Sequence, residues 1–223
     1  VSNDYGSSAI LEASIVGATD VLEILLAHGA DANWRNPEGE TPLMNVARAG
    51  QLQAAELLLA NGAEVDAIEQ WGGQTALLWA AAQQQPEMIA LLIRHGADVN
   101  HTSIVRQWDR TILNEPRPLT YNRGGLTALH FAAREGCIEC VRVLTEAGAD
   151  PDVHDPERVT PLNVALLNQH FATAAALIEA GADVNKWDIY GRTPLFNAID
   201  LHTLPIGGRP DIPSSDLISG HDI

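Results

Sequence analysis

The chain has 223 residues, of which 46% are hydrophobic, so disorder along its whole length is not expected. It carries 29 Asp and Glu against 13 Lys and Arg, a net charge of −16 that would repel phosphate backbones and argues against nucleic-acid binding. No apolar run approaches the roughly 20 residues that span a bilayer, so direct membrane insertion is not expected.

Two landmarks recur along the chain at the same spacing. The first is a glycine that ends a short apolar run, and it lies at Gly29, Gly62, Gly96, Gly148 and Gly181. The second is a hydroxyl residue that precedes another apolar run, and it lies at Ser8, Thr41, Thr75, Thr127, Thr160 and Thr193. Both landmarks advance by 33 or 34 residues, apart from one step of 52. Two independent markers therefore indicate an internal repeat with one long insertion.

Each repeat is predicted to contain two short helices followed by a turn. The hydroxyl residue is typical of a helix N-cap, and in three repeats a proline follows it at the first helical position, where a missing N–H costs little. A second helix, such as the one in Val21–Gly29, ends at a glycine that tolerates the left-handed conformation. The turn carries another glycine two residues before the hydroxyl. Arg158 takes that place in the fifth repeat, which predicts a looser turn there.

The pattern of a turn with D-x-x-G-x-T-P-L-H, two helices and G-A-D-V-N resembles the ankyrin repeat. This resemblance implies an all-α ankyrin-repeat solenoid, with β-turn or hairpin fingers, that covers the chain outside two insertions. The segments REGCIECVRVLTEAGAD and NKWDIYGRTPLFNAIDLHTLPIGGRPD are similar to large uncharacterised bacterial ankyrin-repeat proteins. That likeness slightly favours an exported or periplasmic location over a cytoplasmic one.

The chain then forms a single domain, 1–223, of five complete repeats and a truncated sixth. The approximate repeat boundaries are 1–33, 34–67, 68–100, 101–152, 153–185 and 186–223. Neither end shows the polar outer face of a capping repeat, so we expect a fragment of a longer array, the alternative being a natural C-terminal tail.

Two loops are inserted into this array. The loop at 101–120, in the fourth repeat, fits neither a helix nor a strand pattern, and arginines outnumber acidic residues around it. It could fold back onto an acidic groove, present Trp108 and its arginines to a partner, or simply be flexible. The loop at 203–217, in the sixth repeat, contains three prolines that exclude a continuous helix.

Aromatic residues collect on the turns and first helices, which form the concave surface that repeat proteins use for binding. The residues we expect in a partner site are Trp34, Trp71, Trp79, Arg106, Trp108, Arg110, Phe131, Trp187 and Tyr190. Several could instead cover the joints between adjacent turns, and for Trp71 and Trp79 this structural interpretation is equally good. The negative net charge would select a partner with a basic surface, although such a charge also serves solubility alone.

Catalytic or metal chemistry is not expected. Cys137 and Cys140 form a C-x-x-C pair, but zinc would need two further ligands and thioredoxin-type chemistry a βαβ context, so we interpret both as small packing residues. His130 fills the H of TPLH, where the resemblance implies hydrogen bonds within and between turns. Asp200 and His202 are two residues apart and would not face each other on a helix. The sequence therefore predicts no enzyme, no metal and no cofactor.

The function that these observations favour is a monomeric protein–protein interaction module. It would bind a protein through the concave finger and inner-helix face and through the inserted loops. The alternative is a structural spacer or regulatory segment of a larger bacterial protein, exported or not, whose activity lies outside these residues.

Overall fold

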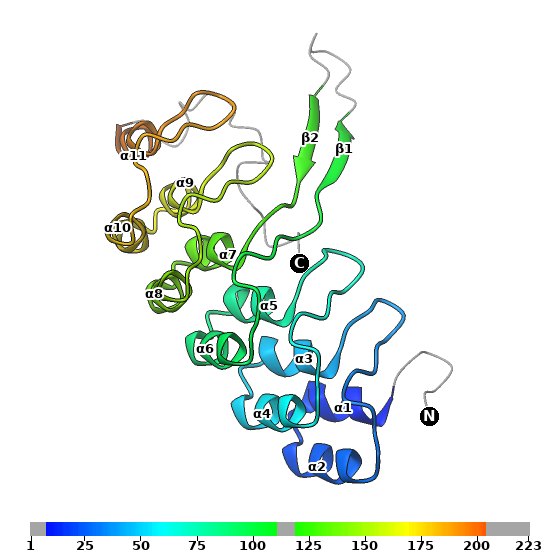
Figure 1. Ribbon diagram of the computed structural model, residues 1–223. Coiled ribbons are helices and arrows are strands. Elements are labelled where there is room, and N and C mark those ends of the chain that lie inside the picture. Colours follow the sequence, from blue (N-terminus) through cyan, green and yellow to red (C-terminus); the bar gives the residue numbers. More distant parts are fainter. Residues whose placement is uncertain (1–7, 111–118, 204–223) are drawn as a thin grey trace.

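The computed structural model describes residues 8–110 and 119–203. Pairs of helices stack side by side into a curved array, with the first helix of each pair in one row and the second in another (Figure 1). The inner row consists of α1 (Ala9–Val16), α3 (Pro42–Arg48), α5 (Ala76–Ala82), α7 (Ala128–Glu135), α9 (Pro161–Leu167) and α11 (Pro194–Thr203). The outer row consists of α2 (Thr19–Ala27), α4 (Leu52–Ala60), α6 (Pro86–Arg94), α8 (Ile138–Glu146) and α10 (Phe171–Glu179). This is the expected solenoid.

The inner helices begin where the hydroxyl residues predicted them to begin. Thr41 Oγ1 accepts a hydrogen bond from the backbone N–H of Met44 at 3.4 Å, and Thr160 Oγ1 accepts one from Asn163 at 3.3 Å. Both threonines are followed by a proline at the first helical position. These caps satisfy amides that have no partner within the helix, so each inner helix starts at a fixed residue.

Small residues let consecutive inner helices approach closely. Alanines at corresponding places are completely buried, namely Ala47, Ala80, Ala81, Ala132, Ala133 and Ala165. Each outer helix also contributes a completely buried leucine, and these are Leu22, Leu58, Leu92, Leu144 and Leu177. Burying one leucine contributes roughly 1.5–3 kcal/mol, so the core between the two rows stabilises the stack.

A ladder of hydrogen bonds joins consecutive repeats beside the G-A-D turns. The last side chain of one G-A-D-V-N segment accepts the backbone N–H of a residue in the next. The pairs, acceptor first, are Asn33–Glu64 (2.6 Å), Asp66–Asp98 (3.0 Å), Asn100–Asp150 (3.0 Å) and Asp152–Asp183 (2.8 Å). The ladder holds each repeat in the same register on its neighbour.

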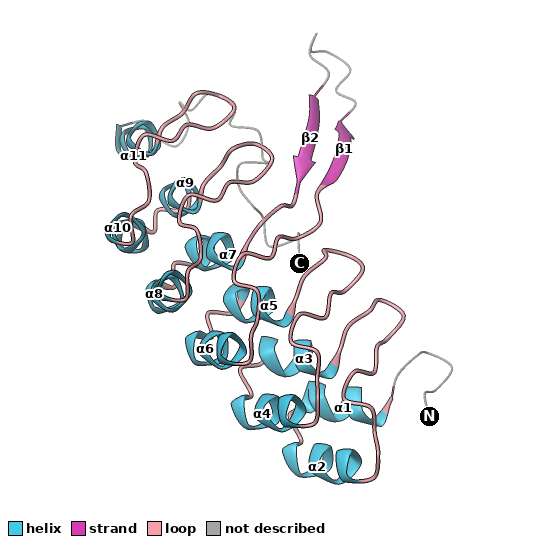
Figure 2. Ribbon diagram, viewed as in Figure 1, coloured by secondary structure: helices cyan, strands magenta, loops and turns pink. Residues whose placement is uncertain are grey.

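The turns between helix pairs project from the inner row as fingers (Figure 2). In the fifth finger, Asp155 Oδ1 accepts the backbone N–H groups of Glu157 at 2.9 Å and of Val159 at 2.8 Å. Neighbouring fingers are also joined, because the N–H of Gln70 donates to the carbonyl of Glu38 at 2.8 Å. Internal carboxylates and backbone contacts therefore make the fingers a rigid edge.

The expectation of a looser fifth turn is wrong. Arg158 has a φ of 63°, in the left-handed region that Gly39 and Gly191 occupy at φ 86° and 77° in other fingers. The backbone follows the same path, with an arginine in a conformation that costs a residue with a Cβ roughly 1–2 kcal/mol. The strain at Arg158 is tolerated because the surrounding finger fixes its backbone.

The insertion in the fourth repeat forms a hairpin, so the expectation that it lacks regular secondary structure is wrong. β1 (Arg106–Arg110) pairs antiparallel with β2 (Leu119–Arg123), placing Trp108 opposite Tyr121 (Figure 2). Cross-strand pairing satisfies the backbone of two short polar segments, neither of which has a recognisable strand pattern by itself. The hairpin lengthens the fourth finger.

The base of this hairpin is anchored to the array. Ser103 is buried, and its Oγ accepts the N–H of Leu126 at 3.0 Å. The N–H of Ile104 donates to the carbonyl of Gly72 in the preceding finger at 2.6 Å. Gly124 closes the base with a φ of 102°, and a Cβ there would overlap the carbonyl of Ile104. The strands therefore leave the array from a fixed point. The second predicted insertion, 203–217, lies beyond the described residues apart from Thr203, the last residue of α11.

Candidate partner-binding surface

Among the residues that the structure describes, five arginines stack on aromatic rings along the fingers and inner helices. The pairs, with the distance from the guanidinium carbon to the ring centroid, are Arg48–Trp79 (5.1 Å), Arg106–Trp71 (5.6 Å), Arg134–Phe131 (4.9 Å), Arg158–Trp187 (4.2 Å) and Arg192–Tyr190 (4.8 Å). A planar guanidinium stacks on a ring better than an ammonium does. This gives a physical reason for the use of arginine at these five places in a chain whose only lysine is Lys186.

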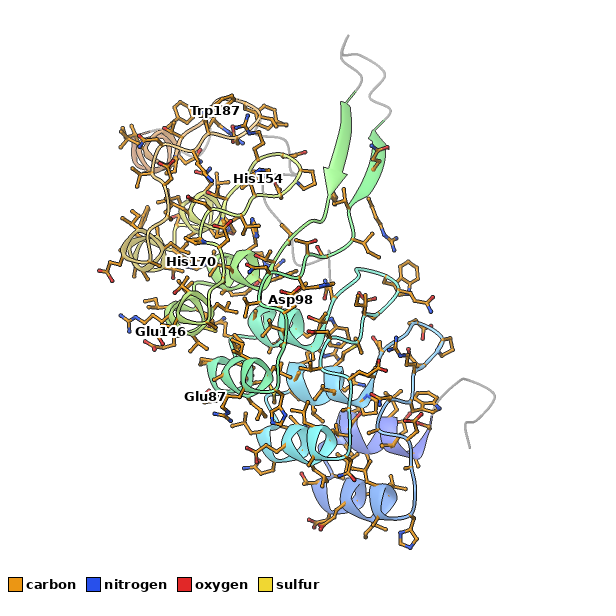
Figure 3. All side chains as sticks on the ribbon, viewed as in Figure 1. Glu87, Asp98, Glu146, His154, His170 and Trp187 are labelled. Atoms are coloured by element: carbon orange, nitrogen blue, oxygen red, sulfur yellow. A yellow bond between two sulfur atoms is a disulfide. The ribbon has the colours of Figure 1, made fainter. Side chains whose placement is uncertain are left out.

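Three of these pairs lie on the fingers and keep their rings in contact with solvent. Trp71 is 67% exposed, Trp187 is 50% exposed and Tyr190 is 45% exposed. We call these three residues the finger aromatics. Figure 3 shows Trp187 on the finger beside α11, whereas Glu87 and Glu146 lie along the outer helices. The finger aromatics thus offer apolar surface on the side of the array opposite those carboxylates.

The third finger holds Trp71 through a buried carboxylate. Glu69 accepts the backbone N–H groups of Trp71 at 2.5 Å, Gly72 at 2.7 Å and Gln74 at 2.8 Å. From the hairpin side, Arg106 Nη2 donates to the carbonyl of Trp71 while its guanidinium covers the indole. The backbone of Trp71 is therefore held from both sides, and one guanidinium stacks on its ring.

The sixth finger uses a similar device for Trp187 and Tyr190. Asp188 is 1% exposed, and its Oδ1 accepts the backbone N–H groups of Tyr190 at 2.9 Å and Arg192 at 3.0 Å. Its Oδ2 accepts Arg192 Nε at 2.7 Å, which orients that guanidinium over Tyr190. Arg158, from the fifth finger, covers Trp187. Two neighbouring fingers are thus joined by a stacked pair at the surface.

Two aromatic residues of the inner helices, Trp79 in α5 and Phe131 in α7, are placed differently. Trp79 and Phe131 are 6% and 2% exposed, and both belong to the hydrophobic core. Little of either ring is left for a partner, so they support the concave face from below. Trp34, in the second finger, is half-buried and packs against the same core.

The hairpin carries the remaining expected site residues. Arg106 is exposed and reaches back to the third finger. Trp108 and Arg110 lie in β1 opposite Tyr121 and Leu119, but their side chains lie outside the described residues. The structure therefore brings Arg106 together with Trp71. Trp71 and Trp187 lie on separate fingers along the edge.

The family description "Ankyrin repeats (3 copies)" matches residues 7–103 and 129–206. The chain belongs to the ankyrin-repeat family. The gap in the match contains the hairpin, in agreement with an insertion between otherwise regular ankyrin repeats.

Several curated relatives share this ankyrin array. Ankyrin repeat and SOCS box protein 16 of Mus musculus is 35% identical over 190 residues, covering 85% of this chain and 40% of the relative. The nuclear factor NF-kappa-B p105 subunit of Gallus gallus is 33% identical over 224 residues, covering 96% and 20%. Ankyrin repeat and KH domain-containing protein mask-1 of Caenorhabditis elegans is 29% identical over 165 residues, covering 74% and 6%. The chain spans less than half the length of each. All three are animal proteins, so they lend no support to the bacterial resemblance.

The ankyrin histidine makes the hydrogen bonds that the resemblance implied. His130 Nδ1 accepts the backbone N–H of Thr127 at 3.2 Å, and its Nε2 lies 3.2 Å from the carbonyl of Val159 in the next finger. Burial lowers the pKa of His130 to about 4, against the raising effect of the Val159 carbonyl and with a smaller lowering effect of His154. A neutral ring that donates from Nε2 therefore links α7 to the following finger.

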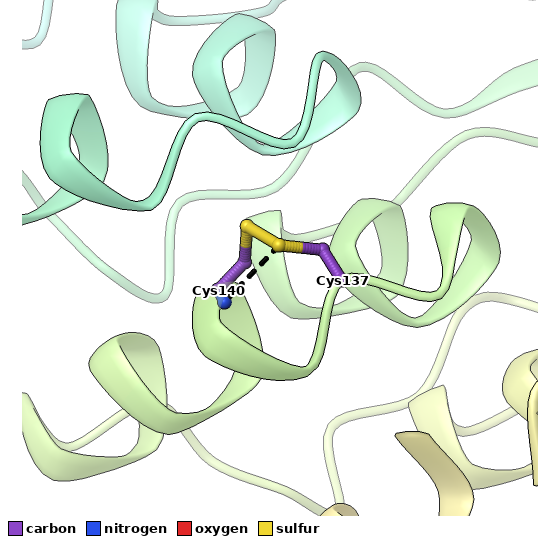
Figure 4. Close-up of a disulfide and its surroundings, with 2 residues drawn as sticks. All are labelled: Cys137 and Cys140. Atoms are coloured by element: carbon purple, nitrogen blue, oxygen red, sulfur yellow. Dashed lines mark hydrogen bonds between the residues drawn. A yellow bond between two sulfur atoms is a disulfide. The ribbon is translucent and has the colours of Figure 1, made fainter. Parts of the chain in front are cut away.

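The cysteine pair was only partly predicted. Cys137 and Cys140 are both buried in the core, as expected for packing residues, but they are also joined by a disulfide (Figure 4). The pattern C-x-x-C is the signal for this bond in the sequence, but without a βαβ context it does not by itself predict a disulfide.

The described residues give no support to the other candidates for catalysis or metal binding. The side chains of Asp200 and His202 lie outside the described residues. Within the described ranges no group of three His, Cys, Asp or Glu residues is placed to hold a metal ion. A search of the same ranges finds no helix with the length and apolarity needed to cross a membrane.

Four arginines of the stacked pairs were not predicted as site residues: Arg48, Arg134, Arg158 and Arg192. The excess of arginine over lysine was their only trace in the sequence. Which aromatic ring an arginine covers depends on contacts within and between repeats.

Proposed function

We propose that this ankyrin array is a non-catalytic module that binds a protein partner through its finger edge and concave inner-helix face. One observation carries the proposal, namely that Trp71, Trp187 and Tyr190 are exposed on rigid fingers, each with an arginine stacked on its ring. Aromatic residues and arginine dominate binding hot spots. Side chains that are already fixed lose less entropy on binding, so the finger aromatics suit this role.

Arg158 adds support of a different kind. A glycine would relieve its left-handed backbone, yet an arginine occupies the site and lies 4.2 Å from the Trp187 ring centroid. The same left-handed backbone occurs at Gln84 and Gln169, so the support rests on the stacking of the Arg158 guanidinium on Trp187. We assign Arg158, Trp187 and Tyr190 to the part of the contact surface on the fifth and sixth fingers. Trp34, Trp71, Arg106, Trp108 and Arg110 extend it along the second, third and fourth fingers, and Trp79 and Phe131 support the face from within.

We further propose that the partner has a basic surface and binds a monomeric array. The net charge of −16 would attract such a partner from a distance and repel acidic ones. The association rate should then fall as salt rises, because mobile ions screen the long-range attraction. An association rate that is constant between low and physiological salt would contradict the basic-surface assignment.

The experiment compares capture by three versions of the array. Immobilised wild-type chain, a Trp71→Ala/Trp187→Ala double variant and an Ile24→Ala control are each exposed to extract from the source cells, and bound proteins are quantified by mass spectrometry. Ile24 is a suitable control because it is 60% exposed on α2, away from the fingers. For a protein that the wild-type chain captures specifically, recovery should fall at least about tenfold in the double variant, because a hot-spot residue contributes about 2 kcal/mol. Recovery of the same protein should stay unchanged in the Ile24→Ala control. Equal recovery by all three versions would refute the finger site.

A second candidate is a spacer or regulatory segment of a larger protein, exported or not. It is favoured by the small share of each relative that the chain covers, and by names such as "E3 ubiquitin-protein ligase" and "KH domain-containing" among the relatives. The full reading frame tests this candidate. A fused domain with its own activity, together with no loss of that activity in the Trp71→Ala/Trp187→Ala variant, would favour the spacer.

A further inference from the structure

The disulfide lies at the start of α8, in the turn that follows α7 (Figure 4). Cys137 is the N-cap of this helix, and Cys140 is the third residue within it. The Sγ of Cys137 accepts a hydrogen bond from the backbone N–H of Cys140 at 3.2 Å. The sulfur therefore takes the place of the hydroxyl or carboxylate oxygen that usually caps a helix.

The other outer helices reach the same conformation without sulfur. Helices α2, α4, α6 and α10 begin after Ala18, Gln51, Gln85 and His170, and none of these side chains caps its helix. The backbone bonds nevertheless correspond, because Ala55 donates to the carbonyl of Gln51 at 3.0 Å just as Val141 donates to that of Cys137 at 3.1 Å. The repeat therefore needs no disulfide at this step, and the bond can open without disturbing the helix pair.

A reduced Cys137 would be stabilised as a thiolate. Its sulfur accepts the backbone N–H of Cys140 at the positive end of a helix of nine residues. Thiolates at helix N-termini, above all in C-x-x-C pairs, are the reactive species in thiol–disulfide exchange. Cys137 and Cys140 have different access to solvent, because Cys137 is 8% exposed and Cys140 is completely buried. Of the two residues, Cys137 is therefore the one that an incoming thiolate can approach.

We propose that Cys137 and Cys140 form a redox-active dithiol–disulfide site that exchanges with small dithiols and disulfides while the array stays folded. In reduction, one thiolate of a dithiol attacks Cys137 Sγ, the S–S bond breaks, and Cys140 leaves as a thiolate that takes a proton from water. The second thiol of the reductant, as its thiolate, then attacks the reductant sulfur of the mixed disulfide. Cys137 leaves as a thiolate held by the Cys140 N–H, and the reductant departs as a disulfide. In oxidation by oxidised glutathione, the Cys137 thiolate attacks one glutathione sulfur, the S–S bond breaks and a first glutathione thiolate leaves. The Cys140 thiolate then attacks Cys137 Sγ of the mixed disulfide, and a second glutathione thiolate leaves.

This site is independent of the finger edge. The cysteines follow the C-terminal end of α7, whereas the fingers precede the N-terminal ends of the inner helices. Reduction should therefore leave partner binding through the fingers intact, and the redox proposal stands or falls separately from the proposed function.

The first test uses the whole chain, which contains no other cysteines. The protein is equilibrated in mixtures of reduced and oxidised glutathione, free thiols are trapped by alkylation, and the peptide that contains both cysteines is measured by mass spectrometry. We expect reversible conversion between dithiol and disulfide, with the same far-UV circular dichroism in both states. The proposal is wrong if the pair stays reduced in excess oxidised glutathione, or if dithiothreitol opens the bond only at urea concentrations that unfold the array.

Single variants test the assignment of the attacked sulfur. In Cys140→Ser, the remaining Cys137 should form a mixed disulfide with glutathione at least about tenfold faster than Cys140 does in Cys137→Ser, because only Cys137 combines access with thiolate stabilisation. Serine is itself a good N-cap, so Cys137→Ser should keep α8 intact. Equal rates, or a faster reaction at Cys140, would overturn the assignment. Circular dichroism of each variant shows whether it is folded.

Discussion

The fingers and the inner helices of this array use the same arginine–aromatic contact in opposite surroundings. On the fingers, Trp71 and Trp187 lie in solvent beneath Arg106 and Arg158. On the inner helices, the ring of Trp79 is buried beneath Arg48. A buried ring contributes its apolar surface to folding, whereas an exposed ring retains that surface for a partner. The comparison separates the residues that stabilise the groove from those that are available to bind.

The largest expected effect comes from exchanging tryptophan for alanine in the two regions. Trp79→Ala should lower the free energy of unfolding by about 3–5 kcal/mol, because it opens a cavity in the core. Trp71→Ala should change it by no more than about 0.5 kcal/mol, as is usual for an exposed side chain. Urea unfolding followed by circular dichroism measures both. If the two variants lose similar free energies of unfolding, the distinction between a buried structural ring and an exposed binding ring is wrong.

A second prediction concerns protons on the inner row. His130 has a pKa of about 4 in the folded chain, below the 6.5 of an unfolded histidine. Between these two pH values the histidine is protonated in the unfolded chain and neutral in the folded chain. Folding stability from this residue is therefore fully present above pH 6.5 and falls as the pH drops towards 4, by on the order of 3 kcal/mol.

This pH dependence is measured by urea unfolding at pH 7 and pH 4.5. His130→Asn is the matched variant, because it cannot take up a proton. It should be less stable than the wild type at pH 7, where the ring bonds are lost, and the difference should shrink at pH 4.5. A difference that is independent of pH would show that His130 does not carry the effect.

The smallest expected effect sharpens the comparison at one finger. Arg158→Gly should raise the free energy of unfolding by about 1 kcal/mol, because glycine adopts the left-handed conformation without strain. The same change should weaken partner binding, since Trp187 loses its stacked guanidinium. Arg158→Lys keeps the strain and the charge but not the planar stack, so it should weaken binding without stabilising the chain. If Arg158→Gly is more stable and binds the partner as tightly as the wild type does, Arg158 does not belong to the binding site.

Much of the fold could be predicted from local chemistry. Helix starts at Thr41 and Thr160 follow from hydroxyl caps, and the helix-ending turn at Gly29 follows from a conformation that only glycine adopts cheaply. Because every repeat carries these signals, a register error in one repeat would conflict with all the others. The assignment of aromatic residues to fingers and inner helices followed from the same register.

The contacts that decide exposure and chemistry could not be predicted in this way. Trp71 and Trp79 belong to one repeat, and only the neighbouring helices and the hairpin determine that the first is exposed and the second is buried. The backbone hydrogen bonds of β1 are made by β2, which lies further along the chain, so neither segment alone has a sequence pattern that predicts a strand. The left-handed Arg158 is likewise imposed by its finger against its own preference.

The hydrogen-bond ladder has a consequence for how such a chain can grow. Asn100 accepts the N–H of Asp150 across 50 residues at 3.0 Å, whereas Asp152 accepts that of Asp183 across 31 residues at 2.8 Å. Closing the longer segment costs only about 0.4 kcal/mol more in chain entropy. The hydrogen bond between neighbouring repeats therefore forms both with and without a long insertion between them. The fourth finger is an insertion site, where sequence can be added, removed or replaced. An unrelated small domain with adjacent termini could be inserted there while the repeats keep their order.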